Sequence, residues 1–112
     1  MPLSTVPHAT DLSLEQSQRL ALVFKALSNP HRLVIYHRLL QQHASTFRCC
    51  LLQDLIDHLE IGAPTVSHHV KELERAGLIE VERVGRYLRC RLNESMRVHV
   101  QDFLACMTVD TP

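Results

Sequence analysis

The stretch that most constrains the fold of this chain covers residues 62–92, where a helical pattern gives way to a strand pattern. Val66, Val70 and Leu73 recur at i, i+4 and i+7, so they lie on one stripe of a helix. A helix with one apolar stripe buries that stripe in a core and leaves its other side for solvent or a partner. The pattern therefore predicts a half-buried helix with a polar outer face.

Both ends of this helix are marked in the sequence. Gly62-Ala63-Pro64 predicts its start, because proline is tolerated in a first turn whose N–H groups have no intrahelical partner. Gly77 predicts its end, because a glycine in the left-handed conformation commonly stops a helix, and Leu78 is then placed to cover that end.

A β-hairpin is predicted directly after this stop. Residues 78–83 and residues 86–92 alternate between apolar and polar with a period of two, and Val84-Gly85 between them is the expected turn. The apolar members of both strands are expected to share a buried face, namely Ile79, Val81, Leu88, Cys90 and Leu92.

The outer face of the helix carries short hydroxyls, an imidazole and an amine. These groups suit the major groove of DNA, where they can contact base edges or phosphates. The expected contacts from the helix are Thr65, Ser67, His68 and Lys71. Adjacent residues on a helix point about 100° apart, so His68 is expected to face the groove while His69 packs inward.

The hairpin carries a local excess of positive charge. Arg83, Arg86, Arg89 and Arg91 lie in a stretch without a carboxylate, which gives it a charge of about +4 and favours phosphate binding. In a hairpin taken alone, such arginines are equally typical of a solvated strand face. Next to the helix they favour nucleic acid, and Arg83, Arg86 and Arg89 are expected to reach flanking phosphates or the minor groove. Lysine plus arginine equal aspartate plus glutamate at 12 each, so binding must rest on this local asymmetry and weaken with salt.

Three further helices are predicted upstream. Leu52, Leu55, Ile56 and Leu59 mark a short amphipathic helix, and the brief connection at about residues 60–63 makes the two a helix-turn-helix. Asn29-Pro30 predicts the start of an earlier helix. Its expected inward residues are Leu33, Val34, Tyr36, Leu39 and Leu40. Ser13 to Gln16 is typical of a capping box that opens the first helix, whose apolar residues are Leu20, Val23, Phe24 and Leu27.

Four motifs together resemble the ArsR/SmtB family of bacterial winged-helix repressors. They are Leu27-Ser28-Asn29-Pro30-His31-Arg32-Leu33, Thr65 to Leu73, Ala76-Gly77-Leu78-Ile79 and Gly85 to Leu92. The resemblance covers about residues 15–107. It implies a symmetric homodimer, packed through its first and last helices, that represses an operon until an effector binds.

The C-terminal segment from Glu94 carries an apolar stripe at near-heptad spacing over about 15 residues, which predicts a helix that needs a partner surface. Packing against its own domain is one interpretation, and the resemblance favours dimerisation with the first helix. The expected interface residues are Leu20, Phe24, Met96, Val100, Phe103 and Met107. A two-fold dimer would read double-stranded DNA at a pseudo-palindromic operator with half-sites about 34 Å apart.

The expected fold class is mainly α with a β-hairpin wing, that is, a winged helix-turn-helix of about five helices and a two-stranded wing. A chain of 112 residues buries one core, so one domain is expected over residues 13–108, with a loose arm at 1–12 and a tail at 109–112. Apolar stretches stay well short of the roughly 20 residues of a membrane span. We therefore expect a cytoplasmic protein without a membrane partner.

Cysteines are the expected site of effector binding. Two adjacent thiolates, Cys49 and Cys50, are soft ligands for trivalent arsenic, antimony or a soft metal, and Arg48 favours their deprotonation. A trigonal site needs a third sulfur, for which Cys106 is the expected ligand. Cys90 is expected in the core, in register with its apolar neighbours. DNA binding itself is expected to need no cofactor.

The sequence is also compatible with functions other than metalloid sensing. Cys49 or Cys50 could pair with Cys106 through a disulfide or polysulfide, in a repressor that senses oxidants or reactive sulfur. The arsenite sensors of the family carry Cys-Val-Cys inside the helix where this chain has Leu51 to Leu55. A winged-helix module that binds protein and has no inducer is the third possibility. An enzyme is not expected, because the sequence shows no phosphate cradle, nucleophile elbow or paired catalytic carboxylates.

Overall fold

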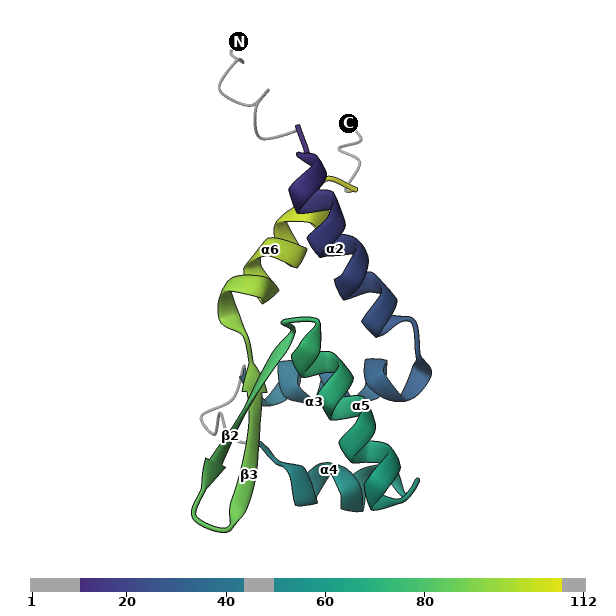
Figure 1. Cartoon of the computed structure of the whole chain (residues 1–112), viewed down its shortest axis with the longest axis vertical. Coiled ribbons are helices and arrows are strands. Elements are labelled where there is room, and N and C mark those ends of the chain that lie inside the picture. Colours follow the sequence, from purple (N-terminus) through teal and green to yellow (C-terminus); the bar gives the residue numbers. More distant parts are fainter. Residues whose placement is uncertain (1–10, 44–49, 108–112) are drawn as a thin grey trace.

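The computed structural model describes residues 11–43 and 50–107, and Figure 1 shows how their helices and strands are arranged. The elements in chain order are α2 Leu14–Leu27, α3 Pro30–His43, β1 Cys50–Leu51, α4 Leu52–Leu59, α5 Ala63–Arg75, β2 Ile79–Val84, β3 Tyr87–Leu92 and α6 Glu94–Ala105. These described ranges therefore form a winged helix-turn-helix, which confirms the predicted fold class. The expected loose arm and tail lie almost wholly outside the described residues.

The first two helices begin where the sequence predicts. Ser13 Oγ accepts a hydrogen bond from the Gln16 backbone N–H at 3.0 Å, and Gln16 Oε1 accepts one from the Ser13 N–H at 3.0 Å. This reciprocal pair is the predicted capping box of α2. At the start of α3, Asn29 Oδ1 accepts from the backbone N–H groups of His31 at 2.9 Å and Arg32 at 3.2 Å.

The buried face of α3 differs from the prediction. Leu33 and Val34 were expected to face inward, but they are 51% and 41% exposed. The buried residues are Ile35, Tyr36 and Leu39. Since consecutive helical residues are about 100° apart, a stripe centred on Ile35 and Leu39 places the two residues before it on the opposite side. An unbroken apolar run did not reveal which of its members would face the core.

The sheet has one strand more than predicted. β2 and β3 form the expected hairpin, here called the wing, with Gly85 and Arg86 between them, one residue later than the predicted turn. The short strand β1 pairs with the other edge of β3, so the antiparallel order is β1-β3-β2, and Cys50 lies opposite Cys90. A strand of two residues is too short for a period-two alternation, so no sequence pattern predicts it.

The core is built from side chains of both halves of the chain. Among its largest fully buried side chains are Ile35, Leu55, Leu73, Leu78 and Ile79. The predicted inner face of the wing is confirmed in part: Ile79, Cys90 and Leu92 are buried, whereas Val81 and Leu88 are half-buried.

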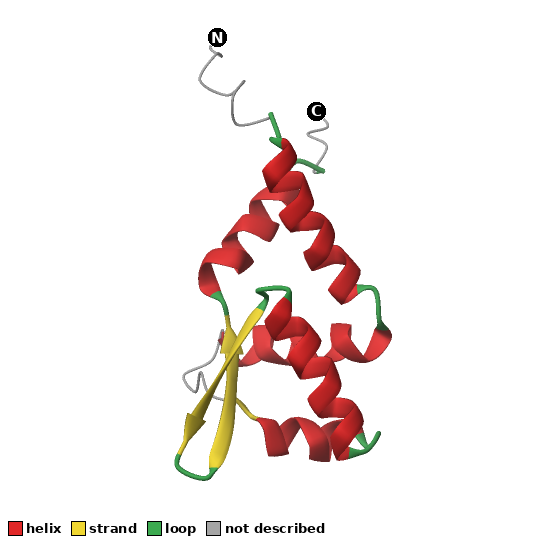
Figure 2. Ribbon diagram, viewed as in Figure 1, coloured by secondary structure: helices red, strands yellow, loops and turns green. Residues whose placement is uncertain are grey.

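The molecule has two distinct ends along its longest axis (Figures 1 and 2). α2 and α6 meet at one end, where the rings of Phe24 and Phe103 lie with their centroids 5.7 Å apart. α4, the start of α5 and the tip of the wing lie at the other end (Figure 1). No helix within residues 11–43 and 50–107 is long and apolar enough to cross a membrane.

Candidate nucleic-acid interface

Helix α5 presents the face that the sequence predicts for DNA. Thr65, His68 and Lys71 are exposed and Ser67 is half-buried, whereas Val66, His69, Val70 and Leu73 are buried. The two adjacent histidines therefore divide as expected, with His68 outward and His69 inward. The polar outer face is accessible along the helix, which leaves it available for a duplex.

Local geometry fixes both ends of α5. Gly62 precedes the helix at a φ of 97° and Gly77 follows it at a φ of 85°, a region that L side chains rarely adopt. At the C-terminal end, the Leu78 N–H donates to the Leu73 carbonyl at 3.0 Å and the Gly77 N–H donates to the Glu74 carbonyl at 3.0 Å. These two bonds make a Schellman motif, and Leu73 and Leu78 are both fully buried beneath it. The helix thus ends firmly where the wing begins.

The buried side of α5 contains an ionisable group. His69 Nδ1 accepts a hydrogen bond from Arg32 Nε–H at 3.1 Å, and the His69 side chain is 7% exposed. Burial lowers the pKa of His69, and the charges of Arg32, His31 and His68 lower it further. His69 is therefore held neutral behind the exposed face.

The arginines of the wing fall into two groups. Arg83 and Arg86 flank the turn at Gly85 and are exposed, and within the described residues no carboxylate forms an ion pair with either. Both belong to the predicted DNA contacts, and the fold brings them to the tip of the wing.

The other two arginines are neutralised by the neighbouring strand. The register places Glu82 opposite Arg89 and Glu80 opposite Arg91. Arg89 forms a hydrogen-bonded ion pair with Glu82, and Arg91 Nε donates to Glu80 Oε1 at 3.2 Å. The hydrogen bond from Arg89, together with the charges of both arginines, lowers the pKa of the Glu82 carboxyl. The stretch of four arginines is therefore less positive in space than along the sequence, because its counter-charges come from β2.

The predicted dimer residues lie around α2 and α6, but most of them already pack within the protomer. Leu20 and Val100 are buried, Phe24 and Phe103 contact each other, and only Met107 is largely exposed, at 69%. Met96 packs beside Gly77, where an added Cβ would lie 3.3 Å from its Cε. Most of these side chains therefore pack within the chain, and their part in a dimer interface stays a prediction.

Other apolar side chains at the same end are open to solvent. They are Leu14 and Leu22 of α2 and Val98, Leu104 and Met107 at α6, all at least 40% exposed. We call these five residues the terminal apolar face. Exposed apolar surface of this kind is typical of an interface with a partner.

Of the predicted cysteine ligands, the structure describes Cys50 and Cys106, and it does not bring these two together within one chain. Cys49 lies outside the described residues, Cys50 is buried opposite Cys90, and Cys106 is exposed at the end of α6. The end of α6 lies at the far end of the molecule from β1 and α4 (Figure 1). In residues 11–43 and 50–107, no group of three or more His, Cys, Asp or Glu side chains is placed to hold a metal ion.

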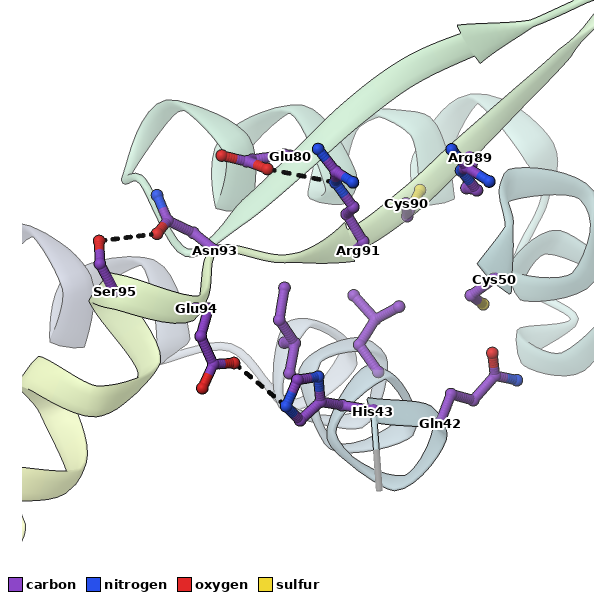
Figure 3. A pocket seen from close by; sticks show the side chains of 12 residues that line it. Gln42, His43, Cys50, Glu80, Arg89, Cys90, Arg91, Asn93, Glu94 and Ser95 are labelled. Carbon is purple, nitrogen blue, oxygen red and sulfur yellow. Dashed lines mark hydrogen bonds and ion pairs between the residues drawn. The ribbon is translucent and has the colours of Figure 1, made fainter. Parts of the chain in front are cut away.

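A groove of about 870 Å³ runs past the buried cysteines (Figure 3). Cys50 and Cys90 lie on its wall, and His43 at the end of α3 contacts Glu94 at the start of α6 across 3.1 Å. The sequence pattern predicts Cys90 in the core but does not indicate that it lies beside Cys50. Only the pairing of β1 with β3 shows that the two thiols are cross-strand neighbours.

Comparison with known proteins shows which proteins this chain resembles. Residues 27–82 match a family described as a helix-turn-helix domain. An uncharacterised HTH-type transcriptional regulator of Methanocaldococcus jannaschii is 34% identical over 74 residues, which cover 66% of this chain and 78% of that relative. An arsenical resistance operon repressor of Staphylococcus xylosus is 30% identical over 87 residues, which cover 78% of each protein.

A solved structure agrees on the fold. The homodimeric winged helix-turn-helix DNA-binding domain of a possible ArsR-family regulator from Mycobacterium bovis superposes with a TM-score of 0.64 at 22% identity, covering 93% of this chain and 87% of that one. The described residues therefore share the winged helix-turn-helix fold of that structure.

Proposed function

The chain belongs to the ArsR/SmtB family of helix-turn-helix transcriptional regulators, and from this premise we propose that it is a homodimeric repressor that binds a pseudo-palindromic operator. The observation that carries the proposal is the joint exposure of the polar face of α5 and the two arginines at the wing tip. A recognition helix with an adjoining basic tip supports base contacts from the helix and phosphate contacts from the wing.

The roles of the side chains follow from their chemistry. Thr65, Ser67 and His68 offer hydrogen bonds to base edges or nearby phosphates, and Lys71 offers a point charge. Arg83 and Arg86 carry charge to the flanking backbone or minor groove. Arg89, also expected to contact DNA, would first have to leave Glu82, so its contribution is smaller.

Dimerisation is supported by the terminal apolar face. Burial of these side chains against a second copy would remove them from water, and each fully buried aliphatic side chain contributes about 1.5–3 kcal/mol. If the two-fold axis through this end sets both copies of α5 on the same side of the pair, they would read half-sites about 34 Å apart. Leu20 and Val100 are already buried within the chain, so they would lie beneath the interface and would not contact the second copy directly.

The test of this function begins with selection of duplexes from a random pool by the purified protein. The expected result is a sequence with two inverted half-sites, bound by a dimer in analytical ultracentrifugation. Binding of the selected duplex should weaken in Lys71→Gln, and it should not change in the control Arg19→Gln on α2. Failure to enrich any sequence, with equal binding to all duplexes, would exclude a sequence-specific repressor.

An effector that acts at cysteine is the second part of the proposal. A thiophilic metalloid such as arsenite, or a soft metal, would bind Cys49 and Cys50 with Cys106 as the third sulfur, and thiol oxidation by a peroxide or polysulfide is the alternative at the same atoms. Since Cys50 is buried in the sheet and Cys106 is exposed at the far end of α6, a ligand that joins them needs a rearrangement or the second copy. Release then requires that the ligand bind the DNA-incompetent shape more tightly.

The effector is identified by titrating the protein on its selected duplex with arsenite, zinc, a peroxide and a polysulfide. Cys49→Ser/Cys50→Ser is expected to abolish the response, Cys106→Ser to weaken it, and Cys90→Ser to serve as the comparison for a buried thiol. An identical response of the double variant to every compound would mean that the adjacent cysteines are structural.

A further inference from the structure

The contact behind α5 joins three helices through one guanidinium. Arg32 Nε–H donates to His69 Nδ1 at 3.1 Å, and Arg32 Nη1 donates to the carbonyl of Ala26 at 3.4 Å. The backbone N–H of Arg32 also donates to Asn29 Oδ1 at 3.2 Å. The same residue thus contacts the end of α2, the cap of α3 and the inner face of α5.

His69 is an unusual residue for its position. Of the described residues, it is the one buried side chain of polar or charged type, and Val66, Val70 and Leu73 surround its position on the helix with apolar groups. A polar group in such a place is costly unless it is hydrogen-bonded, and Arg32 supplies the donor. An aliphatic residue would pack against the core without any such partner, so packing alone does not require an imidazole here.

The contact also defines the protonation state of the imidazole. Because Nδ1 accepts from Arg32, the ring proton is on Nε2 and the ring is neutral. The charged or titratable groups that act on it are Arg32 and His31 from α3 and His68 from its own helix, and all three, with burial, lower its pKa. The ring of His31 lies with its centroid 5.6 Å from that of His69.

His69 lies next to the polar outer face of α5, which is the predicted DNA-contacting face. Its neighbour His68 points outward, and the centroids of the two rings are 5.9 Å apart. Any rotation of α5 that releases His69 from Arg32 also turns His68 and the rest of the outer face. Base contacts depend on such placement to within a fraction of an ångström, whereas phosphate contacts through long flexible side chains tolerate more movement.

We propose that Arg32 and His69 are positioning residues that hold α5 at the angle from which its outer face distinguishes one operator sequence from another. The proposal rests on the DNA-binding function proposed above. Neither residue is expected to touch DNA. Their effect is on sequence discrimination, measured as the ratio of affinities for a matched and a mismatched duplex.

A pH dependence follows from the geometry. Protonation of Nδ1 would turn this acceptor into a donor that faces the Arg32 N–H donor. The hydrogen bond therefore exists only when the ring is neutral. The folded-state pKa of His69 lies below the ordinary value of 6.5, so the unfolded chain binds this proton first. The contact and its stabilisation are therefore complete above pH 6.5 and are lost as the pH falls through the lowered pKa.

The test compares two variants at the same position. His69→Asn keeps an acceptor, Oδ1, close to the place of Nδ1, and His69→Phe keeps the ring but removes the acceptor. We expect His69→Phe to lower the discrimination ratio about tenfold, within the range that one base contact supplies. His69→Asn should restore most of it, and Arg32→Lys should behave like His69→Phe because the Nε–H donor is lost.

The pH profile separates positioning from simple loss of folded protein. As the pH falls below 6.5, the discrimination ratio of the wild type should decrease while that of His69→Asn changes less, since both proteins keep His31 and His68. An equal ratio in wild type and His69→Phe at every pH would overturn the proposal. Failure of the wild type to select any duplex would instead overturn the repressor function.

A measurement on the unmodified chain covers the case in which a variant does not fold. Nitrogen-15 NMR of the free wild-type protein reports which imidazole nitrogen of each histidine carries the proton. A neutral His69 with the proton on Nε2 above pH 7, and a pKa below 6.5, is the expected result. A proton on Nδ1, or a pKa above that value, would contradict the contact on which the proposal stands.

Discussion

The two ends of the molecule differ in the side chains that they expose. At the end formed by α4, α5 and the wing, the exposed surface carries His68, Lys71, Arg83 and Arg86, with Val84 and Tyr87 as apolar residues beside the turn. At the end formed by α2 and α6, it carries the terminal apolar face. Charge attracts phosphates and apolar area favours a protein partner, so the two ends are suited to different partners. A chain of zero net charge can therefore still expose a local group of basic side chains, here at one end of the molecule.

The largest expected effect comes from the apolar end. Leu104→Asp places a charge in the terminal apolar face, and we expect it to convert the dimer to a monomer and to weaken operator binding by about 100-fold, because two linked half-site contacts become one. Analytical ultracentrifugation and fluorescence anisotropy on the selected duplex measure the two quantities. Gln101→Asp, on an exposed position of the same helix, is the control. A dimer that survives Leu104→Asp would show that this end is not the interface.

A smaller effect is expected at the wing tip. Arg83→Gln/Arg86→Gln should weaken binding to every sequence roughly tenfold, because phosphate contacts carry no sequence information. Arg91→Gln is the matched variant on the same hairpin, and its effect should be small because Arg91 is already paired with Glu80. If Arg91→Gln lowered the affinity for DNA as much as Arg83→Gln/Arg86→Gln does, the division of the wing arginines into two groups would be wrong.

The recognition helix should show a sequence-dependent effect. His68→Ala is expected to cost about 1–3 kcal/mol on the matched operator and little on a duplex altered at the base that His68 contacts. Anisotropy titrations of both duplexes give the difference. A uniform loss on both would reassign His68 to a phosphate.

The smallest expected effect is on stability, at the joint between the two ends. Gly77→Ala forces a side chain to a φ of 85° and brings a Cβ to 3.3 Å from Met96 Cε of α6. We expect a loss of about 1 kcal/mol in the free energy of unfolding, measured by urea denaturation. Gly85→Ala, also at positive φ but with nothing within 4 Å of the added Cβ, separates the backbone strain from the contact with Met96.

Local patterns predicted much of this fold. The capping box at Ser13, the start of α3 at Pro30, the stop at Gly77 and the opposite orientations of His68 and His69 all depend on residues within one or two helical turns. Such features are encoded by short-range geometry, so they can be found in the sequence alone.

The features that escaped prediction depend on contacts between distant segments. Strand β1 exists because Cys50 and Leu51 pair with β3, and the pairing of Arg89 with Glu82 depends on the hairpin register. A charge count along the chain could not foresee that Glu82 would neutralise an arginine across the strand. The exposure of Leu33 likewise depends on which side of α3 meets the rest of the core.

The salt dependence of operator binding tests whether the end formed by α4, α5 and the wing contacts DNA. Plots of log affinity against log salt concentration for wild type and Arg83→Gln/Arg86→Gln should differ in slope by about 2, one for each phosphate contact removed. The control Arg19→Gln, at the apolar end, should keep the wild-type slope. Equal slopes for the wild type and the wing-tip variant would contradict the claim that this end of the molecule binds DNA.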